Sequence, residues 1–360
     1  MTIAYIWLCA LALDASQVPG VVIDHEEAAS HRYIGSPSIV KSRSGAYVAS
    51  HDFFGPGSTQ QSSGVTRVFR SEDRGKTWVR TGELKDQFWS NLFEHKKVLY
   101  LMGTTYEYGR VVIRRSLDEG KSWSDPAFLS GEVNYHTAPV PMAIHGGRIW
   151  RAMEWHPPGK WGFFEALMVS APVNANLMDP ASWTFTARQK FQGGASVVGQ
   201  HWLEGNAIVG QDGKLVNVLR VDNTEHAAIL KDGVVEMVAF PGGAKKFSIR
   251  WDKKTRLYWT LSNPALARYP ESARSPASVR NTLVLMSSRD LKQWSMRATI
   301  LEHPDVEKHA FQYVDWQFEG KDLIVASRTA FDDETGGAHR AHDANYLTFH
   351  RVVGFRSLAK

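Results

Sequence analysis

A short turn-like pattern recurs along the chain, and it constrains the fold more than any other feature. Residues 71–78 read SEDRGKTW and residues 116–123 read SLDEGKSW, so both fit the pattern S-x-D-x-G-x-[ST]-W. A shortened copy, SRDLKQW, occupies residues 288–294, and a looser copy, DPASW, occupies residues 179–183. Three of the four copies follow a segment with the alternation of a β-strand. This recurrence predicts one structural unit repeated along the chain.

The residue types in this pattern explain how it can form a tight turn between two strands. Asp and Ser side chains bond to backbone N–H groups in turns. Gly supplies a position with positive φ, and the Trp ring can cover the turn. Units of four short strands joined by such turns are typical of a β-propeller.

We therefore predict an all-β fold, a β-propeller of four-stranded blades. A strand around residues 21–24 is expected to complete the last blade and close the ring. Six blades are expected and seven are the alternative. The predicted blades begin near Ser36, Trp89, His136, His201, Lys246 and His309.

The chain has 360 residues, of which 43% are hydrophobic. Because it contains no low-complexity or Ser/Gly linker, we expect a single propeller domain over residues 16–360. Residues 3–13 are apolar, too short to span a bilayer and followed by small residues. Residues 1–15 are therefore predicted to be a signal peptide, with a disordered or edge-strand N-terminus as the alternative. This predicts a secreted or periplasmic protein, which would lose its only cysteine, Cys9, on cleavage.

The charge distribution narrows the possible partners. The formal net charge is +5, but Lys and Arg are scattered and form no stripe that would bind nucleic acid. A mild positive balance suits an acidic oligosaccharide or polysaccharide. We expect a monomer without nucleic-acid or membrane partners. No metal or cofactor is predicted, since the H-x-x-H-D run at residues 339–343 is a weak metal motif.

Polar residues interrupt apolar strands where the propeller axis is expected. In this architecture the first strands start, and the second strands end, at the same face of the ring. Burying an unpartnered polar group costs about 1–3 kcal/mol, so many such groups predict a wet pocket. The catalytic candidates are His51, Asp52, His136, Glu204 and His309. The substrate-binding candidates are Arg220, Arg328, Lys246, Asn263, Gln312, Trp155 and Trp202.

The residue types suggest roles for these candidates. Histidine suits proton transfer because its ordinary pKa is about 6.5. The guanidinium fork of Arg220 or Arg328 can bind a carboxylate with two hydrogen bonds. The indoles of Trp155 and Trp202 could stack on sugar rings. A hydrolase, unlike a lyase, would use a carboxylate pair such as Asp52 with Glu154 or Glu204, whose separation decides between retention and inversion.

The repeated turns resemble the Asp-boxes of the sialidase superfamily. In those families Asp-boxes join the third and fourth strands of a blade at the outer rim. Sialidases also carry an arginine at the start of blade one, two further arginines, an acidic Asp and a Tyr–Glu pair. Here RYIGSP at residues 32–37 places Gly35 or Ser36 at the first arginine position. The resemblance makes Tyr313 a possible nucleophile and assigns Arg220 and Arg328 to the carboxylate.

A second resemblance rests on residues 33–39, 49–55, 327–332 and 342–350. These segments look like the propeller enzymes that remove terminal L-rhamnose from rhamnosyl-α-1,4-glucuronate caps of plant arabinogalactans. That group contains both lyases and glycosidases. The resemblance implies a rhamnosyl-glucuronate lyase or rhamnosidase. An exo-α-sialidase-like hydrolase and a non-catalytic glycan-binding propeller are the alternatives.

Overall fold

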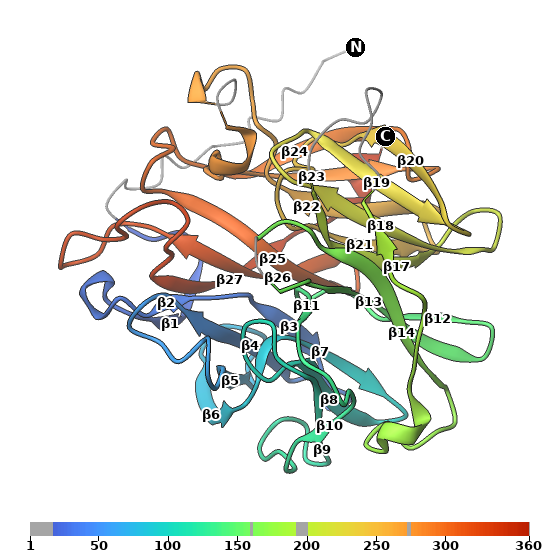
Figure 1. Ribbon diagram of the computed structural model, residues 1–360. Coiled ribbons are helices and arrows are strands. Elements are labelled where there is room, and N and C mark those ends of the chain that lie inside the picture. Colours follow the sequence, from blue (N-terminus) through green and yellow to red (C-terminus); the bar gives the residue numbers. More distant parts are fainter. Residues whose placement is uncertain (1–16, 159–160, 192–200, 272–274, 360) are drawn as a thin grey trace.

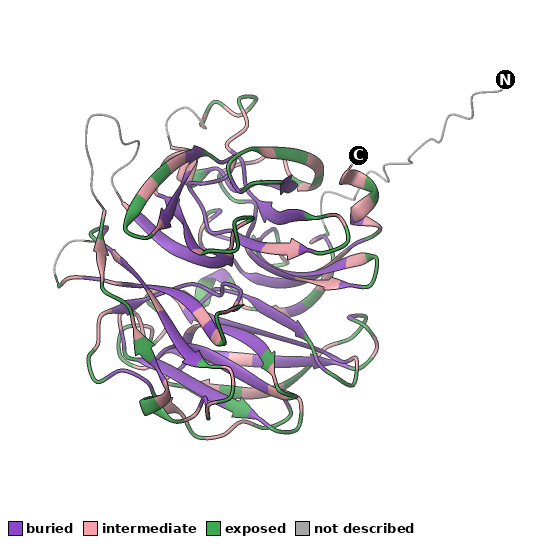
Figure 2. Ribbon diagram, turned by 90° about the vertical axis from the view of Figure 1, so that its right-hand side faces the viewer, coloured by how far each residue is buried: buried purple, intermediate pink, exposed green. Residues whose placement is uncertain are grey.

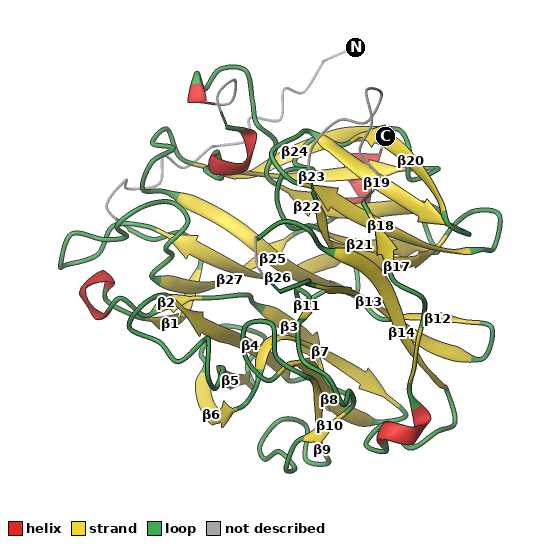
Figure 3. Ribbon diagram, in the orientation of Figure 1, coloured by secondary structure: helices red, strands yellow, loops and turns green. Residues whose placement is uncertain are grey.

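The computed structural model describes residues 17–158, 161–191, 201–271 and 275–359. The predicted signal peptide, residues 1–15, lies outside the described residues. In the described part the chain forms 27 strands in six antiparallel sheets, with only four short 3-10 turns (Figure 3). No helix in these ranges has the length and apolar character needed to cross a membrane. The fold is an all-β propeller of six blades, as predicted.

The first three blades follow one another along the chain. Blade 1 contains β2 (Tyr33–Ile34), β3 (Ser38–Lys41), β4 (Tyr47–Phe54), β5 (Val65–Ser71) and β6 (Val79–Lys85). Blade 2 contains β7 (Phe88–His95), β8 (Val98–Thr104), β9 (Val111–Ser116) and β10 (Ala127–Phe128). Blade 3 contains β11 (Tyr135–His136), β12 (Ala143–His145), β13 (Arg148–Trp155), β14 (Glu165–Pro172), β15 (Thr184–Phe185) and β16 (Gln189–Lys190).

The remaining blades complete the ring. Blade 4 contains β17 (Trp202–Val209), β18 (Leu215–Val221), β19 (His226–Lys231) and β20 (Val234–Ala239). Blade 5 contains β21 (Ser248–Asp252), β22 (Leu257–Ser262), β23 (Thr282–Ser288) and β24 (Trp294–Glu302). Blade 6 contains β25 (Ala310–Glu319), β26 (Asp322–Ala330), β27 (Tyr346–Val352) and β1 (Val21–His25). The 3-10 turns are η1 (Ala28–Ser30), η2 (Pro180–Ser182), η3 (Pro276–Ser278) and η4 (Phe355–Ala359).

Strand β1 closes the ring, because the N-terminal strand completes the sheet formed by the last three strands of the chain. Val21 lies opposite Phe349, and His25 lies opposite Tyr346. The sheet order is β1-β27-β26-β25, and Figure 1 shows blue β1 beside red β27. The predicted closing strand is confirmed. Because both ends of the chain contribute strands to the same sheet, blade 6 is complete and the ring is closed.

The repeated turns form the hydrogen bonds that their residue types predict. Ser71 Oγ accepts from the backbone N–H of Gly75 at 2.8 Å, and Asp73 Oδ1 accepts from that of Thr77 at 2.9 Å. Gly75 has φ of 90°, which a residue with a Cβ rarely adopts. The Trp78 ring packs against Phe349 of blade 6, with centroids 5.6 Å apart. All four copies lie between the third and fourth strands of a blade.

The core consists of apolar layers between neighbouring sheets. Met102 of blade 2 packs in one cluster with Met153 of blade 3, and Trp259 of blade 5 in another with Trp316 of blade 6. Figure 2 shows buried strands running through the interior, with exposed residues gathered at loops and outer edges. Each sheet buries both of its faces, so most strands carry long apolar runs.

A polar contact near the axis joins three blades. The Asp315 carboxylate of β25 accepts from Ser38 Oγ at 2.8 Å and from the Ile39 N–H at 3.0 Å, both on blade 1. It also accepts from Arg250 Nη2 of blade 5 at 2.9 Å. Asp315 is almost fully buried. These bonds connect blade 6 to blade 1 near the axis, in addition to the chain segment that leads from β1 to β2.

Candidate active site

A polar cavity of about 250 Å³ lies where the first strands begin. The predicted convergence of first-strand starts and second-strand ends is therefore correct. Of the twelve predicted site residues, five line this cavity: Asp52, His136, Glu204, Arg220 and Arg328. The side chains that matter for the chemistry are Asp52, Trp89, His136, Glu204, Arg220, Arg280, Tyr313 and Arg328.

Three of these side chains are aimed into the cavity by β-bulges. The pairing register shifts on β7 between Phe88 and Asn91, on β17 around Glu204, and on β25 around Tyr313. Trp89, Glu204 and Tyr313 have φ of 46°, 54° and 53°, in the left-handed region that non-glycine residues rarely occupy. A bulge turns one side chain out of the strand's alternation. Such strained residues concentrate at functional sites.

Tyr313 and Glu204 form a hydrogen-bonded pair at the centre of the site. The Tyr313 hydroxyl donates to Glu204 Oε1 at 2.9 Å. Arg220 Nη1 donates to Glu204 Oε2 at 2.7 Å and to the Tyr313 oxygen at 3.2 Å. Burial alone would raise the pKa of Glu204, but Arg220 and His136 outweigh this and the pKa lies below its usual value. Burial and the Glu204 carboxylate raise the pKa of Tyr313, so a neutral phenol faces an ionised carboxylate.

Three buried guanidinium groups surround the Tyr313 ring. The Arg280 carbon Cζ lies 5.7 Å from the ring centroid, and that of Arg328 lies 4.8 Å from it. Burial, opposed by nearby Tyr313 and reinforced by neighbouring Arg280, lowers the pKa of Arg328 to about 10. Burial also lowers the pKa of Arg280. Among the described residues neither Arg280 nor Arg328 forms an ion pair, so the site holds positive charge that an anionic ligand would neutralise.

Asp52 also lines the cavity. Its Oδ1 accepts from the Ser36 N–H at 2.7 Å, and its Oδ2 accepts from the Trp89 N–H at 2.5 Å. Complete burial raises the pKa of Asp52 to about 6, although both backbone N–H groups oppose the shift. A Cβ on Gly35 would stand 1.7 Å from Asp52 Oδ1. Asp52 therefore occupies the space that a side chain at residue 35 would need.

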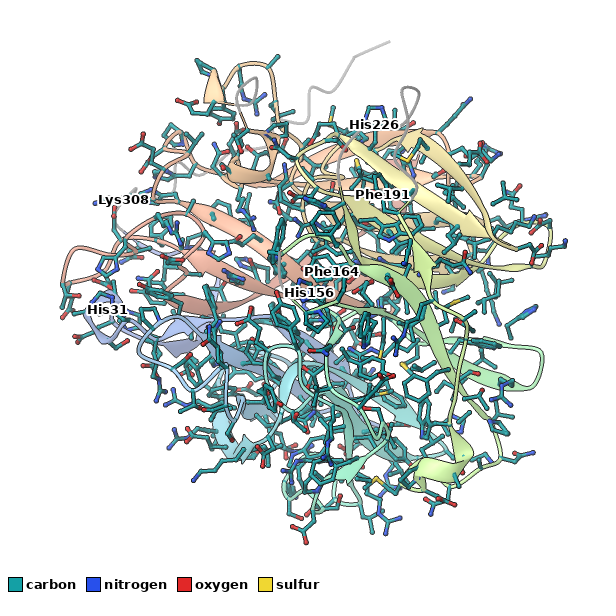
Figure 4. The ribbon with its side chains drawn as sticks, viewed as in Figure 1. His31, His156, Phe164, Phe191, His226 and Lys308 are labelled. Atoms are coloured by element: carbon teal, nitrogen blue, oxygen red, sulfur yellow. The ribbon has the colours of Figure 1, made fainter. Side chains whose placement is uncertain are left out.

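His136 is held by a second buried carboxylate. His136 Nδ1 lies 2.9 Å from Glu154 Oε2, and the Gly205 N–H donates to Glu154 Oε1 at 2.9 Å. Glu154 is completely buried, so one carboxylate fixes both His136 and the backbone next to Glu204. The His136 ring packs against Phe164, which Figure 4 labels beside His156 near the middle of the molecule.

The Glu154→Gln variant tests this arrangement. It replaces a charge-assisted hydrogen bond to His136 by a neutral one and removes a negative charge from behind the site. We expect kcat/KM to fall about tenfold, since a charged hydrogen bond exceeds a neutral one by roughly 1–2 kcal/mol. Steady-state kinetics together with the melting temperature separate this effect from unfolding. Glu165→Gln on the adjacent strand, outside the cavity, is the matched control and should change kcat/KM less than about twofold.

Two predicted catalytic histidines lie outside the cavity. His51 is fully buried, and its Nε2 lies 2.8 Å from Asp24 Oδ2 on β1, because period-two alternation turns it away from its neighbour Asp52. His309 lies 2.8 Å from Asp305 through Nδ1 and stacks on His303 with centroids 3.6 Å apart. Their positions favour a structural role for both residues.

Three further predicted binding residues, Lys246, Asn263 and Gln312, do not line the cavity but bond to residues in or next to its lining. Lys246 Nζ donates to the Val314 carbonyl at 2.8 Å, beneath the bulge at Tyr313. Gln312 accepts from Arg280 Nη1 at 2.5 Å, so it holds that guanidinium in place. Asn263 donates to the Phe311 carbonyl at 2.7 Å.

The two predicted tryptophan platforms also lie elsewhere. Trp202 is buried and donates to the Phe164 carbonyl at 3.0 Å, and Trp155 packs under Arg188, whose Cζ lies 4.1 Å from the indole. The aromatic side chains that line the cavity are instead Trp89, Tyr108 and Trp161, together with Phe54 and Phe88.

Sequence reasoning missed Arg280 entirely. Arg280 lies in the irregular segment after Asn263, two residues before β23, and no predicted site residue lies within that segment. A signal was present, because an arginine three residues before the apolar run at residues 283–286 indicates a cation near the start of a buried strand. Tyr313 was recognised only through the sialidase resemblance.

Comparison with known proteins shows the fold. No family model matches the chain, and no curated protein matches it either. Among solved structures, a Penicillium chrysogenum α-L-arabinanase complexed with arabinobiose is 11% identical with a TM-score of 0.57, covering 93% of this chain and 98% of the other. A Fusarium graminearum α-L-arabinofuranosidase is 10% identical with a TM-score of 0.60, covering 96% of this chain and 100% of the other.

A third similar structure is a Trypanosoma rangeli sialidase in complex with sialic acid. It is 16% identical with a TM-score of 0.60, covering 94% of this chain and 58% of the other. At these identities the similarities support the propeller fold alone. They give no support to the resemblance to rhamnose-removing enzymes.

Proposed function

We propose that this protein is an exo-acting glycoside hydrolase that releases a terminal sugar carrying a carboxylate. The observation that carries the proposal is the Tyr313–Glu204 hydrogen bond, 2.9 Å long, enclosed by three arginines in a small axial cavity. A cavity of about 250 Å³ suits one terminal sugar rather than a passing polysaccharide chain. The arabinobiose and sialic acid complexes of similarly folded proteins support a glycan ligand.

The arginine cluster would bind the substrate carboxylate. Arg220 on β18, Arg328 on β26 and Arg280 in the loop before β23 meet around the Tyr313 ring. Each is held by a partner of its own: Asp222 for Arg220, Gln312 for Arg280 and the His342 carbonyl for Arg328. Preorganised donors lose little entropy on binding an anion.

The first chemical step would be attack by the Tyr313 oxygen on the anomeric carbon. The phenol proton passes to the Glu204 carboxylate, and the glycosidic C–O bond breaks. Asp52 gives its proton to the departing oxygen. A neutral phenol suits a substrate whose own carboxylate repels an anionic nucleophile, and a Tyr nucleophile is a known exception to the usual carboxylate pair.

The second step would release the sugar from Tyr313. Asp52, now ionised, accepts a proton from water as that water attacks the anomeric carbon. The bond to the Tyr313 oxygen breaks, and Glu204 returns the proton to the phenol. Two displacements at one carbon give net retention of configuration.

A panel of substrates tests the proposal. The protein is incubated with the 4-methylumbelliferyl glycosides of N-acetylneuraminic acid, glucuronic acid and L-arabinofuranose, and with gum arabic. Release of the fluorophore from a carboxylate-bearing glycoside, and not from the neutral arabinofuranoside, supports the proposal. Ultraviolet absorbance of an unsaturated uronate from gum arabic would indicate a lyase. Free rhamnose without that absorbance would indicate a rhamnosidase. Either result would overturn the proposal.

The pH dependence of kcat/KM follows from the raised pKa of Asp52. The general acid must be protonated, and its pKa of about 6 means that protonation is complete below that pH and lost above it. Glu204 stays ionised because its pKa is lowered. We therefore expect kcat/KM to fall tenfold per pH unit on the alkaline side, with a midpoint near pH 6. A profile from about pH 4 to about pH 9 measures this limb. Asp52→Asn should lower the rate and abolish the limb, and a limb that survives the substitution would assign it to another group.

The Arg280→Lys variant tests the arginine cluster. Lysine retains the charge but loses the planar fork and the bond to Gln312. We expect KM for an acidic aryl glycoside to rise at least about tenfold, since a hydrogen bond to a charged group is worth about 1.5–3 kcal/mol. Arg188→Lys, outside the cavity, is the matched control. Equal effects of the two substitutions on KM would remove Arg280 from the binding site.

A further inference from the structure

The opposite end of the first strands encloses a second cavity, of about 750 Å³. It is lined by Val209 at the end of β17, by Trp251 near the end of β21 and by Phe318 near the end of β25. The axial site lies at the beginning of these strands, at Glu204 and Tyr313. The two cavities therefore open on opposite faces of the ring.

The second cavity is cationic. Arg250, Lys253 and Arg256 line it, and the described part of its lining holds no Asp or Glu. Arg250 forms an ion pair with Asp315 at 2.9 Å. In the described part of the chain Lys253 and Arg256 form no ion pair. Two cations without counterions beside one cavity favour an anionic ligand.

The other lining groups are those that bind sugars. Trp251 is half-buried, and its indole packs on Tyr258 with centroids 4.6 Å apart, which fixes the ring and leaves part of it accessible. Gln211 and Gln317 place two amides in the same wall. A fixed aromatic surface, amides and cations together can bind the ring, hydroxyls and carboxylate of an acidic sugar.

The described residues that line the cavity include no carboxylate, histidine or cysteine that could cleave a glycosidic bond. The hydroxyl of Tyr258 is already bonded to the Val209 carbonyl at 2.8 Å. The chemistry of the lining therefore fits binding and not catalysis.

We propose that this second cavity is a non-catalytic binding site for a carboxylate-bearing oligosaccharide, held by Lys253, Arg256 and Trp251. A site of this kind would keep the protein on an acidic polysaccharide while the axial cavity acts on chain ends. The binding proposal is independent of the hydrolase proposal, because it uses none of the axial residues.

Calorimetric titration of the full chain with trigalacturonic acid tests the site, with maltotriose as the neutral probe and sulfate as the simple anion. We expect trigalacturonic acid to bind and maltotriose to bind at least about tenfold more weakly. The Lys253→Ala/Arg256→Ala double variant should weaken trigalacturonic acid binding at least about tenfold, without changing hydrolysis of a small aryl glycoside. Lys76→Ala/Lys121→Ala, two exposed lysines of the repeated turns, is the matched control.

The remaining outcomes separate this site from the axial one. Trp251→Phe, which keeps an aromatic ring, should bind more weakly than the parent but retain its melting temperature. Binding that survives Lys253→Ala/Arg256→Ala but disappears in Arg220→Ala would place the ligand in the axial cavity and overturn the proposal. Equal affinity for sulfate and trigalacturonic acid would show an anion site without sugar recognition, which would also overturn it.

Discussion

Tyr313→Phe is expected to lower kcat on a carboxylate-bearing aryl glycoside by at least about 10³-fold. The substitution removes the oxygen that would attack the anomeric carbon and leaves the ring that Arg280 and Arg328 surround. Glu204→Gln should have an effect of similar size, because the amide cannot accept the phenol proton that Glu204 Oε1 faces at 2.9 Å. The double variant should be no slower than the slower single variant, since the two residues act as one unit.

The measurement is steady-state kinetics combined with trapping. A 2-fluoro or 3-fluoro substrate analogue with a good leaving group should leave a covalent adduct on Tyr313, which peptide mass spectrometry locates. Tyr100→Phe, a buried tyrosine of blade 2 away from the cavity, is the control and should retain the parent kcat. An adduct on Glu204 or Asp52, or a Tyr313→Phe variant with parental kcat, would contradict the proposed nucleophile.

Asp315→Ala is expected to lower the free energy of unfolding by about 3–5 kcal/mol, the cost of removing one partner of a buried ion pair. Four groups lose their acceptor: Ser38 Oγ, the Arg250 guanidinium and the backbone N–H groups of Ile39 and Trp316. The effect is large because these bonds join blade 6 to both of its neighbours, blade 1 and blade 5. Denaturant unfolding followed by tryptophan fluorescence measures the loss.

Two further variants show whether the loss of stability comes from removing the acceptor at residue 315. Asp315→Asn keeps an acceptor and should cost less than the alanine variant. Glu307→Ala removes an exposed carboxylate of the loop before β25 and should stay within about 0.5 kcal/mol of the parent. A loss below about 1 kcal/mol for Asp315→Ala would show that the contact does not hold the ring closed.

The comparison of His51 with Asp52 shows how far strand alternation predicts the site. Both residues lie near the end of β4, and both were predicted to be catalytic. Period-two alternation allows only one of two neighbours to face the axis. Asp52 does so, whereas His51 points to Asp24 on the strand that closes blade 6. The sequence shows that one residue of the pair faces the axis, but the choice depends on a contact with a strand from the other end of the chain.

The orientation of Tyr313 depends on a β-bulge. Strand alternation does not predict where Tyr313 points, because the bulge on β25 inserts an extra residue into the pairing with β26. Glu204 and Trp89 lie at equivalent bulges. Bulges depend on register with a neighbouring strand, so a single strand's sequence does not reveal them.

The repeated turns were enough to predict a β-propeller, with six blades expected and seven as the alternative, because the turn at residues 71–78 and its copies are built from hydrogen bonds within a few residues. Such local bonds depend on residue type and spacing alone. The repeat also predicted which face of the ring carries the axial cavity, since strand starts and ends follow from it. Only the tertiary structure brought Arg220, Arg280 and Arg328 around Tyr313 and left Lys246 beneath it. The electrostatic potential at one point sums charges from separate blades, and their distances are fixed by how the sheets pack rather than by their order in the chain.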